Sequence, residues 1–160
     1  MSMEAYVLSK RRLSSQAEWQ RAIDAAGFSV QLMSETPLLE RRGQLPARWG
    51  DREAGFECGH GHAAELMQDY PEVDFGGCWE HLFAFRWSTL PGCAAAYCAA
   101  AAYAAAVDGV MFDPQEATVM MPDEALRIAR ETDAGIPKVE KRLAESALAR
   151  AKRSSSPGTD

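Results

Sequence analysis

A run of fifteen apolar residues from Cys93 to Val107, most of them alanine, constrains the fold of this chain more than any other feature. Alanine has the highest helix propensity, so the run predicts a helix over roughly 92–107 that ends at Asp108-Gly109. Its small side chains allow the helix to approach a sheet closely. A helix that crosses a bilayer needs about 20 apolar residues. We therefore expect this helix inside a fold and expect no membrane partner.

Shorter patterns on both sides of the run predict the remaining elements. Short runs rich in apolar, aromatic or β-branched residues predict strands over 4–9, 28–32, 55–61, 81–88, 110–112 and 117–121, and apolar and polar residues alternate in 28–32 and 81–88. Apolar residues at helical spacing, with Ser15 and Pro122 as start signals and Gly27 and Pro71 as stop signals, predict helices over 15–27, 63–70 and 122–132. Prolines and glycines among charged residues predict an irregular excursion over 34–54.

This order of elements predicts an α+β fold, a two-layer sandwich of a mixed or antiparallel sheet with helices on one face. The length of 160 residues fits one such domain, which we place at 1–136. Gly135 and Pro137 are expected to break the helix that begins at Pro122. Residues 137–153 are then expected to form a peripheral C-terminal helix, and residues 154–160 a disordered tail.

Charge is distributed unevenly along the chain. Residues 57–124 hold one basic residue, Arg86, against eleven acidic residues, a net charge of −10 within a chain of net charge −6. A surface built from this segment would repel phosphate and attract a basic protein, which disfavours nucleic acid as a partner. The most promising partner-binding surface combines its densest carboxylates with an aromatic residue in the 34–54 excursion: Glu65, Asp69, Glu72, Asp74, Glu80 and Trp49.

A cluster of cysteines and histidines supports an alternative function. On a strand, Cys58, His60 and His62 would share one face, and Cys78 with His81 could complete a soft zinc site. The outer two of the three would lie about 13 Å apart on a straight strand, too far for one metal ion unless Gly59 and Gly61 bend the chain. Cys78, His81 and Glu80 could instead form a thiol nucleophile with its base and acid. The plainer interpretation is that Cys58 and Cys78 are reduced core thiols, with no metal and no cofactor.

Residues 109–126, GVMFDPQEATVMMPDEAL, resemble a C-terminal pattern of small bacterial proteins that include immunity proteins of toxin systems. The resemblance implies a protein that neutralises a toxin by covering its active site. The basic cluster of the N-terminus follows its short apolar stretch, the reverse of a secretory signal, which predicts a cytoplasmic protein. The absence of the usual enzyme motifs predicts that it is not catalytic. An acidic surface agrees with it, because many nuclease toxins are basic and opposite charges speed association. The alternatives are a small metal-dependent or thiol enzyme that uses the cysteine and histidine cluster, and a homodimeric assembly subunit.

Overall fold

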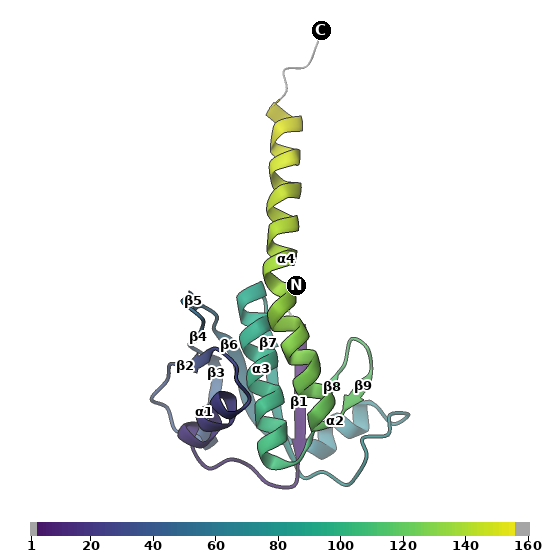
Figure 1. Cartoon of the computed structure of the whole chain (residues 1–160). Helices are drawn as coiled ribbons and strands as arrows, with labels where there is room; N and C mark the ends of the chain where they lie inside the picture. Colours follow the sequence, from purple (N-terminus) through teal and green to yellow (C-terminus); the bar gives the residue numbers. More distant parts are fainter. Residues whose placement is uncertain (1–2, 156–160) are drawn as a thin grey trace.

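The alanine-rich run forms the central helix of the structure, α3 (Leu90–Val107). The computed structural model describes residues 3–155, and in it α3 lies across one face of a six-stranded sheet (Figure 1). The hydroxyl of Thr89 caps the first turn by accepting a hydrogen bond from the backbone N of Gly92 at 3.0 Å. Thirteen residues of α3 are buried, so other elements enclose the helix on most of its surface.

The six-stranded sheet is antiparallel throughout, in the order β3-β6-β7-β1-β8-β9. Its strands are β1 (Met3–Ser9), β3 (Arg42–Leu45), β6 (Phe56–His62), β7 (His81–Trp87), β8 (Val110–Asp113) and β9 (Thr118–Met120). The central pair, β1 and β7, joins Met3 to Trp87 and Ser9 to His81. The predicted α+β class with an antiparallel sheet is confirmed.

The face of the sheet that α3 covers, here called the inner face, carries the main core. Val7, Phe83 and Phe85 point to α3 and to its flanking helices α1 (Gln16–Ala25) and α4 (Pro122–Ser155). Trp19 of α1 lies at the centre of this core: its Nε1 donates to the carbonyl oxygen of Ala99 in α3 at 2.9 Å, and its ring centroid lies 5.2 Å from that of Phe83. One indole thus ties together α1, α3 and β7.

The opposite, outer face of the sheet carries a smaller core. Strand alternation turns Leu8, Leu82, Val110 and Phe112 to this side. The short helix α2 (Ala63–Asp69) and residues 70–80 cover these side chains, and Leu66 and Phe75 are the main apolar contacts that they contribute. Helices α1, α3 and α4 therefore share the inner face, and α2 is an additional cover on the outer one.

The prediction of an irregular excursion over 34–54 is wrong. These residues contain β3, the short 3-10 helix η1 (Leu38–Glu40), β4 (Ala47–Trp49) and β5 (Arg52–Glu53). β4 pairs with β2 (Val30–Leu32) and with β5 in a second, three-stranded sheet. Gly43 and Gly50 have φ values of +86° and +62°. Gly50 lies in the turn between β4 and β5, and Gly43 lies within β3, whereas the number of glycines suggested a chain without regular structure.

The predicted break at Gly135 and Pro137 is also wrong, because α4 is one continuous helix. Two contacts from the small sheet hold it on either side of Pro137: Trp49 Nε1 donates to Asp133 Oδ1 at 2.5 Å, and Arg52 forms an ion pair with Glu140 at 2.6 Å. These contacts offset the backbone hydrogen bond that proline removes. The predicted C-terminal helix thus extends α4 well beyond the body of the fold (Figure 1).

The structure changes the predicted limits of the C-terminal tail and of the alanine-rich helix. The tail predicted at 154–160 lies mostly outside the described residues, and Ser154 and Ser155 are the last residues of α4. Helix α3 begins at Leu90, so its 18 residues are long and apolar enough to cross a membrane by length and composition. In the fold 72 % of that stretch is buried, as in the core helix of a globular protein.

The close approach of β8 to β1 gives a test of this packing. A Cβ atom on Gly109 would overlap the backbone carbonyl oxygen of Leu8, which cannot move without separating the two strands. We expect Gly109→Ala to lower the free energy of unfolding by about 2 kcal/mol or more. The same substitution at Gly135 should raise it by about 0.5–1 kcal/mol, because no atom lies within 4 Å of the new methyl group and alanine favours the helix. Urea unfolding of both variants measures the difference, and similar values would contradict this account.

Candidate functional site

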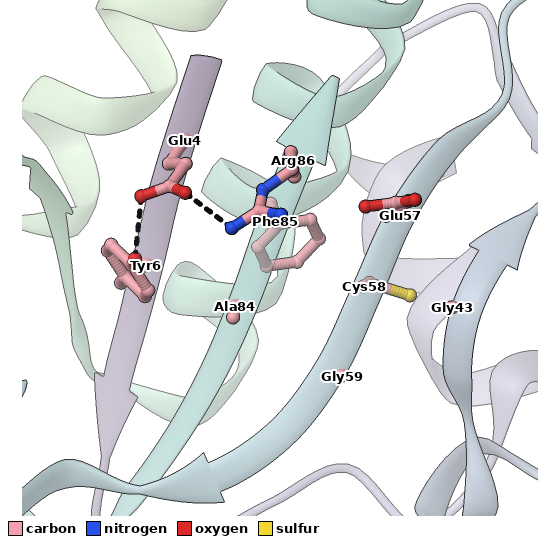
Figure 2. A pocket seen from close by; sticks show the side chains of 9 residues that line it. All are labelled: Glu4, Tyr6, Gly43, Glu57, Cys58, Gly59, Ala84, Phe85 and Arg86. Atoms are coloured by element: carbon pink, nitrogen blue, oxygen red, sulfur yellow. Dashed lines mark hydrogen bonds and ion pairs between the residues drawn. The ribbon is translucent and has the colours of Figure 1, made fainter. Parts of the chain in front are cut away.

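The outer face of the sheet has a covered part and a bare part. α2 and residues 70–80 cover the end of the sheet near Leu8, Leu82 and Val110. Toward the other end of β1 and β7 the side chains of Glu4, Tyr6 and Arg86 face an open surface depression of about 180 Å³ (Figure 2). We call this depression the hollow.

Strand register explains why the hollow exists. Gly59 on β6, Ala84 on β7 and Tyr6 on β1 are neighbours in one row across the sheet. Glycine and alanine leave the first two positions almost empty, so the backbone forms the floor and the ring of Tyr6 forms a wall. A Cβ on Gly59 would meet only the carbonyl oxygen of Arg41, at 4.0 Å, so the empty space is not required by crowding.

A second row places three charges beside the hollow. Glu57, Arg86 and Glu4 are register partners on β6, β7 and β1. Arg86 Nη2 lies 2.6 Å from Glu4 Oε1, and the hydroxyl of Tyr6 donates to Glu4 Oε2 at 2.8 Å (Figure 2). Burial and then this hydrogen bond raise the pKa of Tyr6, so the phenol stays neutral. Glu4 is therefore fully engaged, and Arg86 is neutralised by it.

The predicted acidic residues lie next to the hollow, on the cover of the outer face. Five exposed carboxylates come from α2 and residues 70–80, and we call this surface the acidic layer: Glu65, Asp69, Glu72, Asp74 and Glu80. Within residues 3–155 none of them forms an ion pair with a lysine or an arginine, and Glu80 lies 3.9 Å from His81. Tyr6 links the two regions, since it lines the hollow and packs against the outer core.

The structure does not bring Trp49 to this surface. It lies on β4 in the three-stranded sheet, packs against the main core and donates its indole N–H to Asp133. The guanidinium carbon of Arg52 lies 5.6 Å from the centre of its ring. These contacts give Trp49 a structural role in joining the small sheet to α4.

The cysteine and histidine cluster is only partly assembled. Cys58, His60 and His62 share a face of β6, as the spacing predicted, and His62 is the register partner of His81. Cys58 is buried, and burial raises the pKa of its thiol to about 12, which disfavours a thiolate. Cys78 is exposed. Among the residues described, no three or more histidines, cysteines or carboxylates are arranged to hold a metal ion. All four cysteines are free thiols, as expected.

His60 has an unusual environment. Its ring stacks on Phe83 with centroids 4.2 Å apart, and neither ring nitrogen has a hydrogen-bond partner in the described structure. Burial lowers its pKa to about 4, and the positive charge of Arg12 adds to this shift, while the nearby backbone of Leu38 opposes it. His60 is thus a neutral, apolar-packed side chain at neutral pH.

Comparisons with models of known protein families, with curated proteins and with solved structures gave no match. The residues that form the acidic layer and the hollow must therefore be interpreted on their own geometry. Sequence patterns identified the acidic layer but missed Glu4, Tyr6, Gly59 and Ala84. The one available signal was the alternation of Glu4 and Tyr6 in the first strand, which carries no information about the strand beside it.

The position of His60 predicts a pH dependence of stability. Its folded-state pKa lies below the ordinary 6.5, so the folded protein binds this proton less readily than the unfolded chain. The stability it contributes is complete above pH 6.5 and is lost as the pH falls toward 4. We expect the wild type to lose stability more steeply over this range than His60→Leu, by at most about 1.4 kcal/mol per pH unit. Urea unfolding at several pH values would show parallel curves if this account is wrong.

Proposed function

We propose that this chain is a non-catalytic protein-binding domain that recognises a basic protein through the acidic layer. The observation that carries the proposal is that the five carboxylates of the layer are exposed, lie on one cover of the sheet and have no lysine or arginine partner in the described residues. Carboxylates left without counter-ions give a surface a negative potential, and such a potential steers an oppositely charged protein toward it.

Apolar side chains among these carboxylates support the same proposal. Met67, Tyr70, Val73 and Trp79 pack against the outer core but are only partly buried. Charged groups mainly accelerate association, whereas aromatic and long apolar side chains provide most of the contact energy of a typical interface. The acidic layer therefore combines the two kinds of group that a specific protein partner needs.

Within this class, an immunity protein that neutralises a bacterial toxin is the particular function we favour. The resemblance of residues 109–126 supports it, and a cytoplasmic location in a bacterium belongs to the same proposal. In the fold this segment forms β8, β9 and the start of α4. It supplies a sheet edge and none of the carboxylates of the acidic layer. Selection of one toxin would then depend on the outer face rather than on the segment that carries the resemblance.

The test uses the product of the adjacent gene as the candidate partner and measures association at different salt concentrations. We expect the association rate constant to fall more than about tenfold between about 50 mM and about 500 mM salt, because salt screens exposed charges. Neutralising the acidic layer should produce a similar fall at low salt. The variant carries Glu65→Gln, Asp69→Asn, Glu72→Gln, Asp74→Asn and Glu80→Gln.

A matched control removes the same charge from exposed carboxylates elsewhere on the molecule. It carries Glu35→Gln, Glu40→Gln, Asp51→Asn, Glu53→Gln and Glu145→Gln. This control should leave the rate constant within about twofold of the wild type if local rather than net charge steers the partner. Binding that ignores salt, or an equal loss in both variants, would contradict recognition through the acidic layer.

A further inference from the structure

The hollow on the bare part of the outer face has a floor, a wall and one carboxylate without a hydrogen bond among the described residues. Its floor is the backbone of β6 and β7 at Gly59 and Ala84, and its wall is Tyr6. The carboxylate of Glu57 stands at its edge (Figure 2). No element of the described chain covers this part of the sheet, although it adjoins the acidic layer.

Charge decides which groups can enter the hollow. The guanidinium of Arg86 is held by Glu4, which also accepts the hydrogen bond from Tyr6. Glu57 lies on the other side of Arg86, and its carboxylate forms no hydrogen bond or ion pair within residues 3–155, although its charge helps to raise the pKa of Arg86. The charged residues that line the hollow, Glu4, Arg86 and Glu57, carry a net charge of −1, and the exposed Arg42 on β3 is the register partner of Gly59 in its floor. An anion would be repelled, and a purely apolar group would bury Glu57 without compensation.

A long cationic side chain satisfies both the shape and the charge. Its methylene groups could cover the small floor at Gly59 and Ala84, while its charged end reaches Glu57. Arginine fits better than lysine, because a guanidinium is weakly hydrated, can bind a carboxylate through two N–H groups and can stack on an aromatic ring. Arg86 shows that this face already binds one guanidinium in this manner, through Glu4.

We infer that the hollow is a binding site for one arginine side chain of the basic partner, with Glu57 as its carboxylate ligand. This inference rests on the proposed function and makes it more specific: the acidic layer attracts the partner, and the hollow fixes its position. A side chain at Gly59 is compatible with the strand, because its Cβ would meet only the carbonyl oxygen of Arg41, at 4.0 Å.

The test uses two blocked peptides as probes, acetyl-Gly-Arg-Gly-amide and its citrulline counterpart, which has the same shape without the charge. Nuclear magnetic resonance titration would follow the backbone amides of residues 59 and 84 and give both dissociation constants. We expect the arginine peptide to bind at least tenfold more tightly than the citrulline peptide. Glu57→Gln should weaken arginine binding at least tenfold, which corresponds to about 1.4 kcal/mol.

Two variants that fill the hollow test the shape of the site, so that the conclusion does not depend on whether a single variant folds. Gly59→Val and Ala84→Leu each place a side chain in the hollow and should abolish the shift changes. Glu53→Gln on β5 and Ala144→Leu on α4 are matched controls at exposed positions and should bind the peptide as the wild type does. Circular dichroism melting verifies that each variant is folded.

The outcomes separate this inference from the proposed function. A third probe, acetyl-Gly-Lys-Gly-amide, completes the test. If it binds as tightly as the arginine peptide and the filling variants lose nothing, the face attracts cations only generally, and the inference is overturned. The proposed function still stands if neutralising the acidic layer weakens binding of the adjacent gene's product. Conversely, loss of arginine binding in the hollow variants, with no effect of the acidic layer on that protein, would support the site and reject the proposed function.

Discussion

The near-complete enclosure of α3 is the constraint on which the rest of the structure depends. A helix made largely of alanine offers little apolar area per residue, so it contributes to stability only when other elements approach it on several sides. Large side chains of neighbouring elements fill the volume that alanine leaves empty. Trp19 of α1 donates a hydrogen bond to Ala99, and Phe83 and Phe85 of the sheet lie in the same core as the helix. Gly92 continues this pattern at the helix start, where a Cβ would lie 3.0 Å from the carbonyl oxygen of Gly55.

The packing of the helices around α3 determines which elements remain to cover the outer face of the sheet. Because α1, α3 and α4 all pack on the inner face, only α2 and residues 70–80 are available to cover the outer one. They are too short to reach across six strands, so the part of the face around Gly59 and Ala84 stays bare. The hollow is therefore a consequence of how the helices are divided between the two faces.

Local patterns in the sequence predicted most of the helices and strands, but they did not predict how these elements pack or pair. The capping hydrogen bond from the backbone N of Glu18 to Ser15 Oγ, the left-handed Gly27 and the hairpin of β8 and β9 are all present, because each depends on a few neighbouring residues. The small sheet and the unbroken α4 were missed because both depend on contacts between distant residues, such as Trp49 with Asp133. The row of Glu57, Arg86 and Glu4 joins strands that are far apart in the chain, so its register could not be inferred from alternation alone.

Several basic side chains of the N-terminal third are engaged in hydrogen bonds or ion pairs outside the acidic layer. Arg11 donates to the carbonyl oxygen of Ala106, Arg41 donates to that of Gln44, and Arg52 pairs with Glu140. The only arginine of the acidic segment, Arg86, is paired with Glu4. Cations engaged in this way are not free to neutralise the acidic layer, and moving one of them would leave its present partner unsatisfied. These hydrogen bonds and ion pairs hold the basic side chains in place and stabilise other parts of the fold.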